Sequence, residues 1–340
     1  MRALFIGGTG TISTAVTKLA VEKGFEIYLI NRGNRNSVFA NDSRVKEIHV
    51  DINQEEEVFK TLKDMEFEVV ADFIAFTPTH LERDYRLFSG KTKQFMFISS
   101  ASAYQKPLSD YRITEGTTLA NPYWEYSRNK IACEEYLMKQ YRENGFPITI
   151  VRPSHTYDER SIPLGVHGNH GSWQVIKRML DGKQVIIHGD GTSLWTMTHN
   201  TDFAKGFVGL MGNLHALGET VHITSDETLT WNQIYTAIAN ALQVPLKPYY
   251  ISSSYLSQCS KYDFFGSLIG DKANSVVFDN SKLKCMVPEF VATKRFDQGI
   301  RETIDYVMAH KECQIEDVEF DQWCDKVIEV LETAKNEIIQ

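Results

Sequence analysis

The chain has 340 residues, of which 42% are hydrophobic and 24% are charged, with 36 lysines and arginines against 44 aspartates and glutamates, a formal net charge of −8. This composition is typical of a folded globular protein and excludes a disordered or collagen-like chain. The acidic balance, and the lack of any apolar run of about 20 residues, argue against nucleic acid or a membrane as a partner.

Five cysteines are scattered along the chain without a C-x-x-C pair. This pattern favours reduced thiols over a disulfide framework or a thiolate zinc site. The apolar run after Met1 is too short for a signal peptide, so we expect a cytoplasmic protein. We expect no metal either, because His167 and His170 share a glycine-containing loop with no third ligand in sight.

The first half of the chain alternates short apolar runs with amphipathic helical patterns. The predicted strands are Ala3–Ile6, Glu26–Asn31, Val45–Val50, Val69–Ile74, Gln94–Ser99 and Pro147–Val151. The predicted helices are Thr11–Lys23, Gln54–Leu62, His80–Phe88 and Tyr126–Asn144. This order predicts an α/β fold of the Rossmann type, a doubly wound parallel sheet with helices on both faces.

The pattern changes after Arg152-Pro153. The elements predicted beyond this point are a strand over Gln184–His188, helices over Trp173–Leu180, Asp202–Met211 and Trp231–Leu242, and a surface helix within Gln314–Gln340. We therefore expect two units, a first domain over residues 1–155 and a smaller lobe over residues 156–340 that is interleaved with it and ends in a helical tail.

Glycines follow the first predicted strand directly, in Gly7-Gly8-Thr9-Gly10-Thr11-Ile12-Ser13, and a helical pattern follows them. Gly7 and Gly10 permit a tight turn that brings backbone N–H groups to a pyrophosphate at a helix N-terminus. Ser13 takes the place of a third glycine and is still small. The first domain is thus predicted to bind a dinucleotide, with contacts from Gly7, Thr9, Gly10, Thr11 and Ile12.

The second predicted strand ends in Asn31-Arg32-Gly33-Asn34-Arg35. A carboxylate at this place would bind the ribose 2′-hydroxyl of NAD, whereas Arg32 and Arg35 can pair with the 2′-phosphate of NADP. We therefore expect NADP, with NAD as the alternative, and a contact from Asn31. Asp51 and Ile52, after the third strand, are placed to meet the adenine edge.

Tyr126 and Lys130 are four residues apart, so they share one face of a predicted helix. A cation near a phenol favours the phenolate and lowers its pKa toward the range of a general acid or base. Ser100 follows the fifth strand, at the carboxyl edge of the sheet, where its hydroxyl can donate to a substrate carbonyl oxygen. Ser100, Tyr126 and Lys130 are therefore the predicted catalytic residues.

With these motifs the chain resembles the extended and atypical branch of the short-chain dehydrogenase/reductase superfamily, the NAD(P)-dependent epimerase/dehydratase family. The matching segments are Gly7-x-x-Gly10, Val69–Ala75, Phe97–Tyr104, Tyr126-x-x-x-Lys130 with Glu134, Val151-Arg152-Pro153, Gly189-Asp190-Gly191, Asp202-Phe203-Ala204 and Phe278–Leu283. The resemblance implies hydride exchange between a nicotinamide and a carbon of a sugar or sugar nucleotide, with Tyr126 moving the proton and Lys130 also holding the nicotinamide ribose.

The resemblance also implies further contacts. At the cofactor it implies Phe73, Ile74, Ala75, Ser99, Pro153, Ser154 and His155, the last three beside the nicotinamide carboxamide. At the substrate we expect Ser102, Tyr123, Trp195 and His199. A packing role is the alternative for Tyr123, Trp195 and the two histidines.

Two departures from the family pattern bear on the reaction. Dehydratases of the family carry an Asp-Glu pair after the position of Ser100, and this chain has Ala101 and Ser102 there, which favours a reductase or an epimerase. Many members have an arginine for the substrate diphosphate where this chain has Trp195. An indole can stack on a sugar face, so a carbohydrate-like small molecule is the expected partner.

Two expectations concern partners. Atypical family members bind RNA or sense NADP without catalysis, which is the alternative function; retention of Ser100, Tyr126 and Lys130 favours an enzyme. The helix of Tyr126 continues with residues that in this family commonly form a dimer contact, so we expect a homodimer, with burial in the same subunit as the alternative. These residues are Ile131, Ala132, Glu134, Tyr136 and Leu137.

Overall fold

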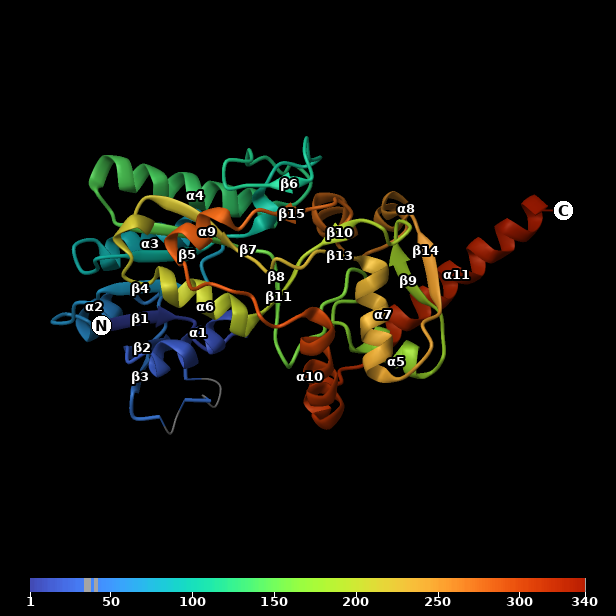
Figure 1. Ribbon diagram of the computed structural model, residues 1–340, viewed down its shortest axis with the longest axis horizontal. Coiled ribbons are helices and arrows are strands. Elements are labelled where there is room, and N and C mark those ends of the chain that lie inside the picture. Colours follow the sequence, from blue (N-terminus) through green and yellow to red (C-terminus); the bar gives the residue numbers. More distant parts are fainter. Residues whose placement is uncertain (34–37, 40–41, 340) are drawn as a thin grey trace.

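The computed structural model describes residues 1–33, 38–39 and 42–339. Figure 1 shows a parallel sheet with helices on both faces at one end of the molecule, and a lobe of helices and small sheets at the other. The strands of the large sheet are β1 (Arg2–Ile6), β2 (Glu26–Asn31), β3 (Val45–His49), β4 (Val69–Asp72), β5 (Phe95–Ile98), β7 (Ile148–Pro153) and β12 (Glu219–Ile223).

The strand order is β12-β7-β5-β4-β1-β2-β3, and every neighbouring pair is parallel. Each of the six predicted strands is present, with ends that agree to within two residues, so the predicted Rossmann-type fold is confirmed. The chain order reverses between β1 and β4, and the crevice at the carboxyl ends of these strands is where such sheets bind ligands.

Successive residues of a strand point to opposite faces of the sheet, so they pack against different layers of helices. Phe5 packs in the same buried cluster as residues of α1 (Thr11–Glu22) and α6 (Asn200–Leu210). Ile6, the next residue, packs in the cluster under α3 (Pro78–Phe88) and α4 (Glu125–Asn144). The short helices α2 (Glu55–Thr61) and α9 (Ser281–Met286) complete these layers.

The seventh strand, β12, was not predicted. Its sequence, Glu-Thr-Val-His-Ile, has no continuous apolar run, and its pairing with β7 is what makes it a strand. Both β12 and α6 come from beyond residue 155, so part of the second half of the chain completes the first unit.

The second lobe is built on its own buried cluster, which includes Trp231, Tyr235 and Ile187. Its helices are α5 (Trp173–Leu180), α7 (Trp231–Leu242), α8 (Ser253–Gln258), the π-helix η3 (Phe265–Lys272), α10 (Phe296–Ala309) and α11 (Val318–Ile339).

Short strands pair as β8 (His155–Tyr157) with β11 (Met197–His199), β9 (Val185–His188) with β14 (Pro248–Ile251), β10 (Leu194–Trp195) with β13 (Leu229–Thr230), and β6 (Arg112–Ile113) with β15 (Val277–Phe278). The 3₁₀ turns are η1 (Ala101–Ala103), η2 (Leu214–Ala216) and η4 (Lys311–Cys313).

Two helical surfaces bear on the expected partners. Glu134 and Leu137 of α4, expected at a dimer contact, are buried within this chain, while Ile131, Ala132 and Tyr136 are only partly buried. The far end of α11 extends away from the lobe, as the red helix in Figure 1 shows. Within the described residues, no helix is both long and apolar enough for a membrane span.

Candidate active site

The glycine turn after β1 lies against the loop after β4. Gly7 has φ +80°, and a Cβ there would come within 2.4 Å of Cγ2 of Ile74. The Ser13 hydroxyl donates to the Gly7 carbonyl at 2.7 Å and accepts from the Gly10 N–H at 2.8 Å. Ser13 therefore closes the turn rather than merely replacing a glycine. Gly10 precedes α1, whose first N–H groups have no partner within the helix.

The loop after β4 is fixed by a buried carboxylate. Asp72 Oδ1 accepts from the backbone N–H groups of Ile74, at 2.6 Å, and Ala75, at 2.8 Å, and Arg83 binds its other oxygen at 3.1 Å. Ile74 is exposed, whereas Phe73 packs its ring on Phe5 at 5.5 Å. Phe73, Ile74 and Ala75 are the cofactor contacts predicted in this loop. Only Ile74 has an exposed side chain at the crevice.

The ends of β2 and β3 carry the residues expected at the adenosine half. Asn31 Oδ1 accepts from the Gly33 N–H at 2.9 Å, and Asp51 accepts from the Asn53 N–H at 2.9 Å, so both side chains shape turns. Ile52 is buried. Arg32 is exposed, and no other described residue engages its guanidinium. Arg35 lies outside the described residues.

A cavity of about 230 Å³ opens at the carboxyl ends of β5 and β7. It brings together seven residues predicted from the sequence: Ser100, Ser102, Tyr126, Pro153, Ser154, His155 and Trp195. Trp124, which the sequence places beside Tyr123 and Tyr126, also lines it, together with residues that were not predicted at the site: Ala101, Lys106, Asp271, Lys272, Val276 and Phe278.

The Ser100 hydroxyl is held by a chain of hydroxyl groups. Ser100 Oγ lies 2.9 Å from Ser102 Oγ and accepts from the Ser102 N–H at 3.1 Å. Ser127, next to Tyr126 on α4, donates to Ser102 Oγ at 2.8 Å. Ser102, expected at the substrate, therefore orients Ser100.

Lys130 is placed by the loop after β4 and by the end of β5. Its Nζ donates to the carbonyl oxygens of Ala75 and Ile98, both at 2.7 Å, and lies 5.7 Å from the centroid of the Tyr126 ring. Burial lowers the pKa of Lys130 to about 8.

The pKa of Tyr126 differs from the sequence expectation. It is raised, because burial outweighs the lowering effect of a hydrogen bond with Ser100. Lys130 is not among the groups that shift the pKa of Tyr126, and its ammonium group donates to the carbonyls of Ala75 and Ile98. At neutral pH the phenol therefore keeps its proton.

A buried ion pair joins α4, the helix that carries Tyr126, to strand β7. Glu134 binds Arg152 through both carboxylate oxygens, at 2.9 and 2.5 Å, and the guanidinium lies 4.8 Å from the Tyr104 ring centroid. Ser99, expected at the cofactor, is buried and donates its hydroxyl to Glu134 instead. The Ser99 side chain is thus structural.

Histidines in and near the cavity have different surroundings. His155 lines the cavity, and its pKa is lowered to about 3, first by burial and then by Lys272 and His167, so it is neutral. His199, expected at the substrate, caps α6 by accepting from the Thr201 N–H at 3.3 Å and packs edge-on against Tyr157. His199 does not line the cavity, and the packing alternative describes it.

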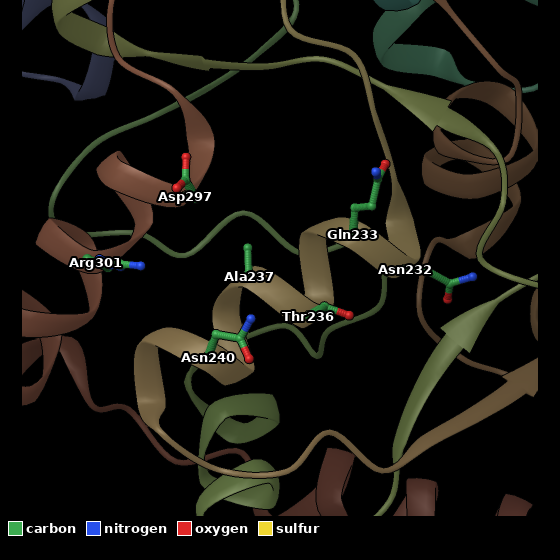
Figure 2. A pocket seen from close by; sticks show the side chains of 7 residues that line it. All are labelled: Asn232, Gln233, Thr236, Ala237, Asn240, Asp297 and Arg301. Atoms are coloured by element: carbon green, nitrogen blue, oxygen red, sulfur yellow. The ribbon is translucent and has the colours of Figure 1, made fainter.

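Two further hollows lie outside this cavity. Tyr123 lines a neighbouring one of about 560 Å³, which shares Trp124 and Tyr126 with the first. Figure 2 shows the other, of about 360 Å³, in which side chains of α7 face Asp297 and Arg301 of α10. None of the predicted site residues lines it. In the described part of the chain, no group of three or more His, Cys, Asp or Glu side chains is arranged to hold a metal.

Comparison with known sequences adds a family and several relatives. The model of the NAD dependent epimerase/dehydratase family matches residues 3–223. The 2′-dehydrokanamycin reductase of Streptomyces kanamyceticus is 21% identical over 258 residues, 76% of this chain and 71% of that protein. An uncharacterized UDP-glucose epimerase of Bacillus subtilis is 31% identical over 134 residues, 39% of this chain and 40% of that protein. A chloroplast stem-loop binding protein of Arabidopsis thaliana is 24% identical, over 71% of this chain and 63% of its own length.

Solved structures share the fold at low sequence identity. The UDP-glucuronic acid 4-epimerase of Bacillus cereus, in complex with UDP-glucuronic acid and NAD, superposes with a TM-score of 0.72 at 18% identity, covering 91% of this chain and 99% of that one. The dTDP-glucose 4,6-dehydratase of Bacillus anthracis, in complex with NAD, gives a TM-score of 0.71 at 18% identity, covering 92% and 98%.

Proposed function

Because the chain belongs to the NAD dependent epimerase/dehydratase family, we propose that it is an oxidoreductase that transfers hydride at a carbonyl or carbinol carbon of a carbohydrate-like substrate. A single observation carries this proposal. Ser100 and Tyr126 line one cavity with Pro153, Ser154 and His155, and Lys130 lies beside the Tyr126 ring.

The residues of the crevice fit a nicotinamide dinucleotide. The approach of Gly7 to Ile74 leaves no room for a Cβ, and the turn that Ser13 closes ends at the N-terminus of α1, which favours a pyrophosphate. Gly7, Thr9, Gly10, Thr11 and Ile12 would hold that group, and Ile74 would lie beside it. Pro153, Ser154 and His155 would hold the nicotinamide end, where the cofactor supplies or accepts a hydride.

The roles of the chain's own groups follow from their positions. In the reductive direction, Ser100 donates a hydrogen bond to the carbonyl oxygen and Tyr126 delivers its phenolic proton to the same oxygen. The raised pKa of Tyr126 supports the reductive direction, because the phenol carries a proton at neutral pH and can donate it. Lys130, whose Nζ lies 5.7 Å from the Tyr126 ring centroid and donates to two backbone carbonyls, would hold the nicotinamide ribose.

Three further features support a reductase that uses NADP over an epimerase or a dehydratase. Arg32 is exposed at the end of β2, where a cation can bind a 2′-phosphate. Ala101 and Ser102 lack the acid and base groups that an elimination requires. The relative from Streptomyces kanamyceticus is named a reductase as well. Epimerisation with a retained NAD is the alternative within the same chemistry.

The test combines cofactor titration with one substitution. NADPH and NADH are titrated against the protein, and sugar nucleotides and keto sugars are then screened for oxidation of the preferred cofactor. We expect tighter binding of NADPH, and we expect Tyr126→Phe to lower kcat by about 10²- to 10⁴-fold while the affinity for NADPH stays unchanged. Full turnover by Tyr126→Phe on an accepted substrate would refute the proposed catalytic role.

The non-catalytic alternative has a separate test. Its support is the relative named a stem-loop binding protein. RNA affinity that falls steeply with salt, without any cofactor oxidation, would favour it. A homodimer, a cytoplasmic location and the division at residue 155 remain predictions of the same proposal.

A further inference from the structure

One wall of the cavity carries charged side chains that have no role in the proposed proton transfer from Tyr126. We call Lys106, Asp271 and Lys272 the charged wall. Lys106 follows η1, whereas Asp271 and Lys272 end the π-helix η3, far along the chain. All three residues line the cavity, although Lys106 is only 3% exposed and the other two are 8% exposed.

These charged groups lack the partners that buried charges usually have. Among the described residues, no hydrogen bond or ion pair reaches Nζ of Lys106, and Asp271 acts on it only through its charge. Lys272 Nζ lies 3.9 Å from an Asp271 oxygen, 3.5 Å from the Ser267 carbonyl and 5.8 Å from the Trp124 ring centroid, so all of its contacts are long. Buried ammonium and carboxylate groups are almost always paired, because desolvation without a partner is costly. The charged wall is therefore incomplete without a ligand.

The backbone of the charged wall is held in place at Lys272. The backbone carbonyl of Lys272 accepts from Trp231 Nε1 at 3.1 Å and from Ser193 Oγ at 3.3 Å, and it lies 3.2 Å from His188 Nε2. Three side chains of the second lobe thus converge on one carbonyl of the site. Groups fixed before binding lose little entropy when a ligand arrives.

Two lysines face one aspartate on this side of the cavity, and His155 is neutral. Burial lowers the pKa of Lys106 and Lys272 and raises that of Asp271, so an anion bound here would favour the charged ammonium groups. Asp263 also acts on Lys272, but it is exposed and lines the neighbouring hollow. Lys130 does not line the cavity, and its ammonium group donates to two backbone carbonyls instead.

We propose that the substrate carries an anionic group, a carboxylate or a phosphate, which Lys106 and Lys272 bind while Asp271 accepts a hydrogen bond from a substrate hydroxyl. This inference rests on the proposed function and adds the charge of the substrate to it. It makes Lys106, Asp271 and Lys272 the specificity-determining residues of the cavity.

The experiment measures binding to the full chain by isothermal titration calorimetry, with and without NADPH. The probes are D-glucuronate, D-glucose 6-phosphate, neutral D-glucose and cationic D-glucosamine, since they share one ring and differ in charge. We expect at least one of the two anions to bind about tenfold or more tightly than D-glucose, as a charge-assisted contact provides. The two anion arms distinguish a carboxylate from a phosphate.

Variants then assign the preference to the charged wall. We expect Lys106→Met and Lys272→Met each to lose most of the preference for the anion, and Asp271→Asn to keep or increase it. Lys326→Met, at an exposed position of α11, is the control that keeps the preference. The wild-type comparison of the four probes stands even if a buried variant fails to fold.

The outcomes separate this inference from the proposed function. Absence of NADPH binding by the wild-type protein would count against the proposed function. NADPH binding with no preference for either anion over D-glucose would overturn the inference alone. Tightest binding of D-glucosamine, lost in Asp271→Asn, would also overturn it, because the charged wall would then recognise a cation.

Discussion

Single residues of the site take their properties from neighbours that are distant in the sequence. The four-residue spacing of Tyr126 and Lys130 correctly predicts a shared helix face, with the ammonium 5.7 Å from the ring centroid. The direction of the Tyr126 pKa shift nevertheless depends on burial and on Ser100. Spacing along a helix brings two groups together, but the surrounding atoms determine which of them is charged.

A prediction at this scale concerns Gly7. Gly7→Ala and Gly24→Ala both place a Cβ at positive φ, +80° and +84°, but only Gly7 has Ile74 in the way, whereas Gly24 has open space. We expect Gly24→Ala to lower the free energy of unfolding by about 1 kcal/mol and Gly7→Ala to lower it by about 1 kcal/mol more, in urea denaturation. Ile74→Ala should recover the additional loss in Gly7→Ala, and equal losses in the two single variants would contradict the steric argument.

At the scale of elements, α4 is the part on which the site depends most, because it carries Tyr126, Ser127 and Lys130. Its register against the sheet is fixed by the pair of Glu134 with Arg152 of β7, in which both side chains are about 95% buried. Ser99 at the end of β5 adds a hydrogen bond to the same carboxylate. The pair therefore joins the helix to two strands directly behind the cavity.

Removing one member of this pair should leave an uncompensated buried charge. We expect Glu134→Leu to lower the free energy of unfolding by about 3 to 5 kcal/mol, and a double variant with Arg152→Met to lose less than the sum of the single changes. Lys139→Ala on the same helix is the control, because its pair with Glu143 is exposed and contributes under about 1 kcal/mol. A loss in Glu134→Leu no larger than in this control would contradict the anchoring role.

At the scale of the whole molecule, the two parts share elements in a way that the sequence order hides. The cluster on one face of the sheet contains Phe203 and Phe207 of α6 together with Phe5 of β1. The cavity itself combines strand ends of the first part with η3 and Trp195 of the second. The site is thus a product of the joined structure rather than of either half.

We therefore expect a fragment of residues 1–155 not to fold. It would lack β12 and α6 and so expose apolar surface that the full chain buries. Near-ultraviolet circular dichroism and urea denaturation should show no cooperative transition for the fragment. Truncation of the chain after residue 334 is the control and should leave the transition unchanged, because residues 335–339 at the end of α11 are exposed. A cooperatively folded fragment would contradict the interleaved arrangement.

The sequence by itself determined the elements with strong local signals. Six strands of the sheet, the glycine turn and the helix of Tyr126 are predictable because their periodicity and turn residues are local properties of the chain. The same order predicts that Ser100, Tyr126 and Pro153 lie at one edge, since parallel strands align their carboxyl ends.

Only the tertiary structure decided what depends on contacts between distant segments. The strand β12 exists through its pairing with β7, and the side chains of Ser99 and His199 form hydrogen bonds with Glu134 and Thr201. The charged wall could not be predicted, because Lys106 and Lys272 lie far apart in the sequence and each alone resembles a solvated lysine. Their burial in one cavity is a consequence of packing, which no local pattern encodes.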